Sequence, residues 1–188
     1  MPIDKKTPSR KELVIDPADL PLLLPLLQQG VQIEVENDRS LEDLLCRQWG
    51  LERDYVLGRI STLFLNGRPV DDIEKARVTD GARLALSCAM PGLIGATMRR
   101  GGVLASFRSS ISHQEKQSAT SRSRRALITV KLFNMLTREL GPLLLARGIL
   151  APPSALDMLK PRYPALNRMT AERIAVRIPI DDVNPALS

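Results

Sequence analysis

Aromatic residues make up only 3% of this chain of 188 residues, so its core has to be built mainly from Leu, Ile and Val. A hydrophobic content of 44% is enough for such a core. No apolar run approaches the ~20 residues of a bilayer-spanning helix, and no basic N-terminal segment leads into an apolar stretch and a cleavage site. We therefore expect a cytoplasmic protein that does not enter a membrane.

Residues that bind metals or attack substrates are scarce as well. The chain has two cysteines, Cys46 and Cys88, and one histidine, His113. The cysteines stand far apart within apolar patterns, which is typical of buried free thiols rather than of a disulfide. One histidine without a cysteine cluster argues against a structural zinc site and leaves no ordered base for a nucleophile. The composition predicts a protein with no metal, no cofactor and no catalytic activity of its own.

Charge is distributed unevenly along the chain. Residues 1–98 hold 12 lysines and arginines against 15 acids, whereas residues 99–188 hold 15 against 6. The candidates for binding an anionic partner, including nucleic acid, are Arg99, Arg100, Arg108, Arg122, Arg124 and Arg125. Such contacts would be independent of sequence and sensitive to salt. Only Phe107 is available in this stretch to stack on bases, so we favour a solvated linker over a nucleic-acid site.

Turn and periodicity signals order the first half of the chain. Ser40 is a good helix N-cap, Asn66-Gly67 is a preferred hairpin turn, and Asp80-Gly81 marks a second turn. The expected elements are strand 11–15, helix 18–29, strand 31–36, helix 40–49, strands 60–65 and 68–70, and strand 83–88. One main helix across a small mixed sheet is the α+β fold called the β-grasp, or ubiquitin-like fold. We expect it over residues 11–105, after a flexible tail at 1–10.

The stretch FLNGRPVDDIEKARVTDGARLALSCAMPGLIGA (residues 64–96) resembles the C-terminal half of the prokaryotic sulfur-carrier proteins. These are the small subunit of molybdopterin synthase and the carrier of the thiamine pathway. Asn66-Gly67, Asp80-Gly81, the strand at 83–88 and Pro91 match in order and approximate spacing. The resemblance implies a β-grasp fold and a terminal Gly-Gly whose carboxylate is adenylated by a partner enzyme with ATP and then accepts sulfur.

Gly101-Gly102 is the candidate carrier terminus, in a stretch (MRRGG) that resembles the end of ubiquitin. Within this chain the pair is internal, so it has a peptide carbonyl in place of a nucleophilic carboxylate. A carrier or modifier would need proteolysis after Gly102 and an adenylating enzyme as its partner. We favour a turn or hinge, because the apolar material beyond residue 126 is typical of a folded segment.

The second half begins with a basic linker at 106–126, rich in Ser, Arg, Gln and Lys. Beyond it, apolar residues recur at helical spacing in Val130, Phe133, Leu136, Leu140 and Leu144. We therefore expect a mainly helical region over 127–188, with a break or kink at Gly141-Pro142 and either a strand or a helix at 174–180. The segment 127–150 is expected to pack on its own domain or to mediate homo-oligomer formation.

The sequence thus predicts a non-catalytic, ubiquitin-like protein-interaction module with a helical extension. Its open sheet face and edge strands would bind a protein partner. The first alternative is a sulfur-carrier or modifier precursor that is cleaved after Gly102. The second is a weak electrostatic nucleic-acid binder that acts through residues 99–125.

Overall fold

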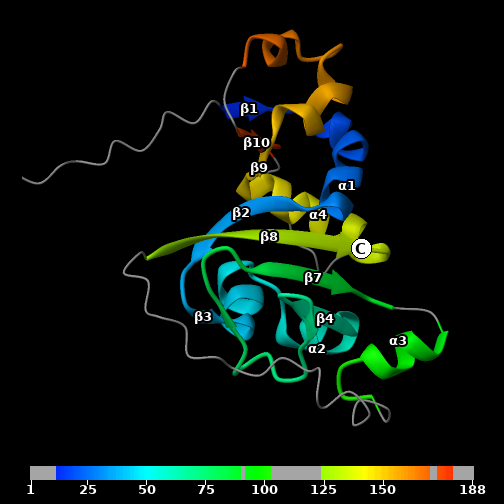
Figure 1. The fold of residues 1–188 in the computed structure, drawn as a ribbon. Helices are drawn as coiled ribbons and strands as arrows, with labels where there is room; N and C mark the ends of the chain where they lie inside the picture. The colour runs from blue at the N-terminus through cyan, green and yellow to red at the C-terminus, as the bar shows by residue number, and fades with distance from the viewer. Residues whose placement is uncertain (1–11, 90–91, 103–123, 170–172, 180–188) are drawn as a thin grey trace, which may run out of the picture.

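The computed structural model of the chain describes residues 12–89, 92–102, 124–169 and 173–179. It is an α+β structure with a mixed eight-stranded sheet in the order β1-β10-β9-β2-β8-β7-β4-β5 (Figure 1). The strands are β1 (Glu12–Val14), β2 (Val31–Glu36), β4 (Thr62–Leu65), β5 (Arg68–Pro69), β7 (Arg83–Ser87), β8 (Arg125–Phe133), β9 (Ile149–Ala151) and β10 (Ile174–Arg177). A separate pair joins β3 (Arg39–Ser40) to β6 (Arg77–Val78).

Helical segments connect these strands. They are η1 (Pro17–Asp19), α1 (Leu20–Gln29), η2 (Asp43–Gln48), α2 (Arg53–Arg59), α3 (Gly92–Met98), α4 (Met135–Arg147), η4 (Pro153–Leu159) and η5 (Pro164–Arg168). In η2 the backbone N–H of Trp49 donates to the carbonyl of Leu44, five residues back, at 2.9 Å. This is the wider turn of a π-helix. The short helix that follows, α2, was not predicted from the sequence.

The helix end, the N-cap and the hairpin turn predicted in the first half of the chain are confirmed. α1 ends at Gly30, which has a φ of 114°. The Oγ of Ser40 accepts a hydrogen bond from the backbone N–H of Asp43 at 3.1 Å, as an N-cap does. Asn66 and Gly67 both have positive φ, 53° and 79°, in the hairpin that joins β4 to β5. Gly30, Asn66 and Gly67 have positive φ values, which few residue types other than glycine and asparagine adopt.

Strand β8 overturns the helix predicted from residue 127 onward. It lies between β2, to which it is antiparallel, and β7, to which it is parallel. Ala126, Ile128, Val130 and Leu132 are buried and alternate with residues that are exposed or half-buried. The β-branched pair Ile128 and Val130 favours this extended form. Helical spacing holds only for α4. Of the two alternatives at Gly141-Pro142, a break or a kink, the break is excluded, because α4 continues through this pair.

The region 127–188 is therefore not confirmed as mainly helical. Its described part contains β8, α4, β9, η4, η5 and β10, and the open choice at 174–180 is resolved as a strand. Strands from both halves of the chain share one sheet, because β8 pairs with β2 and β7 along their lengths. The end of the predicted linker, residues 125–126, belongs to β8. The tail at 1–10 and most of the linker lie outside the described residues.

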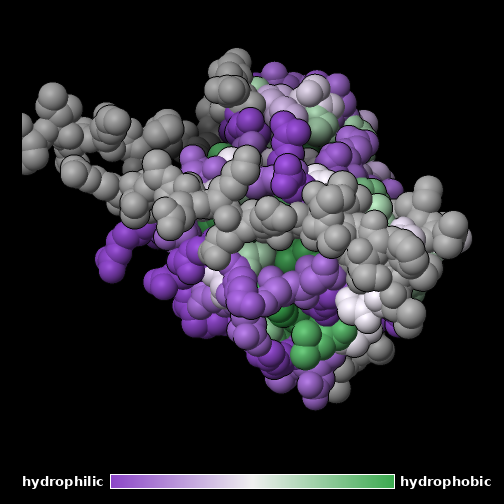
Figure 2. Space-filling model, turned by 60° about the horizontal axis from the view of Figure 1, so that its bottom comes forward, coloured by the Kyte–Doolittle hydropathy of each residue, from purple (hydrophilic) through white to green (hydrophobic). Residues whose placement is uncertain are grey.

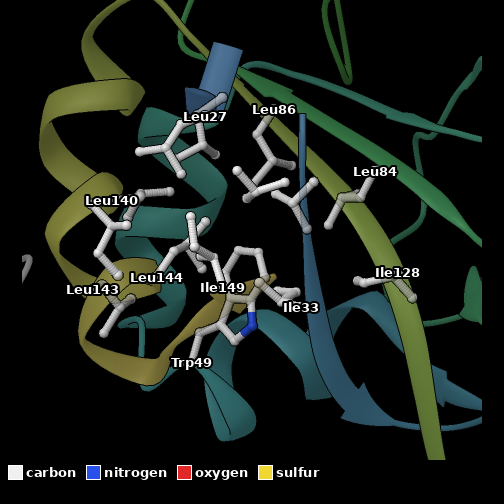
Figure 3. Close-up of a cluster of buried hydrophobic side chains, with 14 of the residues drawn as sticks. Leu27, Ile33, Trp49, Leu84, Leu86, Ile128, Leu140, Leu143, Leu144 and Ile149 are labelled. Carbon is white, nitrogen blue, oxygen red and sulfur yellow. The ribbon is translucent and has the colours of Figure 1, made fainter. Parts of the chain in front are cut away.

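The core lies between one face of the sheet and the helices α1, α4 and η2. Cross-strand neighbours such as Ile33 and Ile128 are both buried on this face. Figure 3 shows Leu140, Leu143 and Leu144 of α4 on one side of the cluster and the sheet residues Leu84 and Ile128 on the other. The remaining labelled residues, Leu27, Leu86, Ile149, Trp49 and Ile33, lie between them. Of the two alternatives predicted for 127–150, packing on its own domain or homo-oligomer formation, the apolar side of α4 follows the first.

Candidate interaction face of the sheet

On the face of the sheet that points away from α1, α4 and η2, Thr62 and Ser87 are buried at one end. The exposed and half-buried side chains of this face form what we call the open sheet face. It consists of Gln32, Glu34, Phe64, Arg83, Ala85, Leu127, Thr129, Lys131 and Phe133. The strand registers set its rows. Arg83 lies beside Thr129, and Ala85 lies between Phe64 and Lys131. Side chains alternate along each strand, so the same register that buries Leu84 and Val130 presents these residues on the other side.

A shallow groove of about 780 Å³ runs over part of this face. It is lined by Phe64, Asn66, Gly67, Gly81, Arg83, Leu84, Ala85, Thr129 and Lys131. Two glycine turns close one end of it. The Oδ1 of Asn66 accepts a hydrogen bond from the backbone N–H of Arg83 at 2.9 Å, which ties the hairpin turn to the start of β7. The groove is therefore built on rigid strands and on a pinned turn.

Two cations of the groove have no ion-pair partner within the described part of the chain. These are Arg83 and Lys131, both exposed. Nearby arginines behave differently: Arg125 pairs with Glu34 at 2.9 Å, and Arg47 pairs with Glu36 at 2.7 Å. The groove thus combines a partly apolar floor, from Phe64 and Ala85, with two positive charges. This combination suits a partner segment that carries an acidic and an apolar side chain.

Gly101 and Gly102, the candidate carrier terminus, lie in a turn directly after α3. Gly101 has a φ of 63°, and the N–H of Gly102 donates to the carbonyl of Arg99 at 3.2 Å. The neighbouring Arg100 is bound to the domain. Its backbone N–H donates to Ser61 at 2.8 Å, and its guanidinium donates to the carbonyl of Val56 at 2.8 Å.

Arg100 therefore acts as a C-terminal cap of α2. Its guanidinium also reaches the carbonyl of Leu57 at 3.1 Å, and both carbonyls belong to the last turn of that helix. Burial lowers the pKa of Arg100. This side chain stabilises the fold and is not held out toward an anionic partner.

The remaining predicted arginines are not gathered into one site among the described residues. Arg125 is paired with Glu34, and Arg124 is exposed. Both lie at the start of β8, whereas Arg99 and Arg100 follow α3, beyond the far end of the parallel strand β7 (Figure 1). Arg108 and Arg122 fall outside the described residues.

Other surface features are less organised than the groove. Figure 2, which turns the lower side of Figure 1 forward, shows a group of hydrophobic residues surrounded by hydrophilic ones. The exposed large apolar side chains of the described residues are spread over several elements: Val14, Leu22, Leu57, Phe133, Met135 and Met158. Cys46 and Cys88 are free and half-buried. Where the chain is described, no three metal-ligating side chains cluster, and no helix is long and apolar enough to cross a membrane.

Sequence reasoning missed the groove residues for identifiable reasons. Phe64 and Arg83 stand in strands that were predicted, so the alternation of side chains could have placed them on the outer face. Lys131 could not be placed, because its segment was predicted as a helix. No protein-family model matches this chain, and no match was found among curated proteins or solved structures.

Proposed function

We propose that this chain is a non-catalytic protein-interaction module, built on a ubiquitin-like β-grasp sheet, that binds its partner through the open sheet face. The strand order supports the fold assignment. β8 and β7 form a central parallel pair, β2 and β4 flank them as antiparallel neighbours, and β5 extends β4. The helical segment η2 follows β2 in the chain and packs on the face of the sheet opposite to the open sheet face. The sheet departs from a simple β-grasp in two ways: β8 follows β7 in the chain instead of preceding β2, and β9, β10 and β1 extend the sheet beyond β2.

The observation that carries the proposal is the groove with its two uncompensated cations. Arg83 and Lys131 stand over a floor that includes Phe64, on strands held by core packing. Unpaired surface cations attract an oppositely charged partner and set its orientation. The half-buried aromatic ring provides apolar area for the centre of such a contact. A partner segment with an acidic residue next to an apolar one fits this arrangement.

The sheet edges are poorer candidates for partner binding than the face. The edge strand β5 is only two residues long, and one of them is Pro69, which has no N–H to donate. The other edge, β1, is three residues long. Strand addition needs a longer row of unpaired backbone groups, so we assign the contact to the face.

The alternatives gain no specific support from the described residues. A cut after Gly102 would place β8 on a separate fragment, although β8 lies between β2 and β7. A nucleic-acid site would need free arginines, but Arg100 caps α2 and Arg125 pairs with Glu34. We therefore propose neither of these functions for the chain.

Site-specific photo-crosslinking in the protein's own cells tests the proposal. A photoreactive phenylalanine replaces Phe64 in the groove, and a control places it at the exposed Gln28 of α1. We expect a defined crosslinked partner from position 64, none from position 28, and loss of the product when Arg83→Glu and Lys131→Glu are added. Equal products from both positions, or a product that survives the charge reversal, would contradict it. Circular dichroism establishes that each variant is folded.

A further inference from the structure

A second hollow, separate from the groove on the open sheet face, lies where β2 and β9 part. Its volume is about 380 Å³. β2 pairs with β8 along its whole length, but it pairs with β9 only through Gln32 and Leu150. Toward Glu34, β2 has no β9 partner, because β9 begins only at Ile149 and the residues before it are Gly148 and the end of α4. The sheet therefore has a notch beside Glu34 and Val35.

The end of η2 lines the other side of this notch. The Oε1 of Gln48 accepts a hydrogen bond from the backbone N–H of Glu36 at 2.9 Å, where a strand would otherwise pair. Trp49 follows it and is 3% exposed. The π-type turn, with the N–H of Trp49 bonded to Leu44, sets the position of both side chains. Such turns are uncommon and recur at functional sites.

Two arginines line this hollow without a partner in the described ranges of the chain. Arg147 is the last residue of α4, and Arg177 is the last residue of β10. Neither forms an ion pair or a side-chain hydrogen bond there. Both arginine side chains are exposed to solvent. Because they line the hollow without a counter-ion, they are available to an anion that enters it.

The hollow also has two carboxylates in its lining, Glu12 and Glu34. Glu34 is already paired with Arg125 at 2.9 Å, so its charge is largely neutralised. Glu12 is exposed in the edge strand β1. Two arginines against one uncompensated carboxylate leave the hollow with a positive balance.

We propose that this hollow binds a small molecule with an oxyanion group, a phosphate or a carboxylate, between Arg147 and Arg177 and next to Trp49. Guanidinium groups form paired, charge-assisted hydrogen bonds with both kinds of oxyanion. The volume falls in the lower part of the ~300–1,000 Å³ range of small-molecule sites. The binding site is distinct from the groove of the proposed function, so either can fail without the other.

Trp49 provides the readout, since it is the only tryptophan of the chain. Its fluorescence is followed during titration with inorganic phosphate and, separately, with citrate, at constant ionic strength set with sodium chloride. We expect a saturable change with phosphate or citrate that chloride does not produce. The arm that responds at lower concentration identifies the phosphate or the carboxylate class.

Variants assign the response to the two arginines. Arg147→Gln and Arg177→Gln are each expected to weaken binding by about tenfold, the loss typical of one charge-assisted hydrogen-bond partner. Arg138→Gln on the same helix and Arg83→Glu in the groove should leave it unchanged. Arg147→Lys keeps the charge and guards against a variant that fails to fold; it should bind more weakly than the natural protein. No saturable change in the folded protein, or Gln variants that bind as tightly as the natural protein, would overturn the proposal.

Discussion

The hydroxyl of Tyr163 donates a hydrogen bond of 2.7 Å to Oδ2 of Asp19, a residue 144 positions earlier in the chain. The same hydroxyl accepts a bond from the backbone N–H of Asp16 at 2.8 Å, and Arg162 contacts the other carboxylate oxygen of Asp19. Asp19 is only 1% exposed. A buried carboxylate needs such partners, so this cluster fixes the start of α1 against the segment that joins η4 to η5.

Replacing Tyr163 by Phe should lower the free energy of unfolding by about 1–2 kcal/mol, because Asp19 loses a donor and the N–H of Asp16 loses an acceptor. Urea unfolding followed by circular dichroism measures the change. In an Asp19→Asn background the same substitution should cost less, since the two residues interact directly. An unchanged unfolding midpoint in the single variant would show that the contact does not stabilise the fold.

Two glycines in helices should respond to alanine in opposite directions. A Cβ on Gly141 of α4 would lie 2.8 Å from Cδ1 of Leu27 in the packed core, whereas a Cβ on Gly58 of α2 meets nothing within 4 Å. Gly141→Ala should destabilise the protein by about 1–3 kcal/mol through overpacking. Gly58→Ala should stabilise it by up to ~1 kcal/mol through helix propensity. Thermal unfolding of the two variants side by side checks the signs, and a stabilising Gly141→Ala would contradict the close approach of α1 and α4.

Glu139 should make folding sensitive to acid. It accepts hydrogen bonds from the hydroxyl of Tyr55 at 2.6 Å and from Nε of Arg59 at 3.1 Å. The guanidinium of Arg59 holds the pKa of Glu139 below its ordinary value of 4.5. A lowered pKa in the folded state means that the stabilisation is present above pH 4.5 and is lost as the pH falls through the lower, folded-state pKa.

Glu139→Gln should therefore reduce stability at neutral pH and flatten the loss of stability between about pH 5 and pH 3. Urea midpoints measured across this range, for the natural chain and for the variant, provide the comparison. Gln28→Ala, at an exposed position of α1 that carries no titrating group, serves as a control for substitution itself. If the urea midpoints of Glu139→Gln and of the natural chain fell in parallel with decreasing pH, Glu139 would not contribute to the acid sensitivity.

A chain that ends at Gly102 should not fold cooperatively. It lacks β8, so the backbone edges of β2 and β7 lose their shared neighbour and become exposed. It also lacks α4, which covers part of the core. We expect broad unfolding and aggregation in place of the sharp transition of the full chain, measured by circular dichroism and light scattering. A sharp transition in the truncated chain would instead support an independent domain over 11–105.

Local features of this protein followed from its sequence because they depend on neighbouring residues. The positive φ values at Asn66 and Gly67, the N-cap at Ser40 and the helix end at Gly30 are properties of short segments. The alternation of apolar residues over β2 likewise reflects one strand with one buried face. Each of these can be read within a window of a few residues.

The tertiary structure alone decided what depends on distant partners. The apolar residues of β8 also fit a helical period, but the segment is extended because it pairs with β2 on one side and with β7 on the other. The pairing of β7 with β8 brings Lys131 beside Ala85. Other contacts between distant segments place Arg147 and Arg177 around one hollow. Arg100, predicted as a candidate anion ligand, instead caps α2. Contacts between segments far apart in the chain decided these outcomes, and for β8 they agree with the extended preference of Ile128 and Val130.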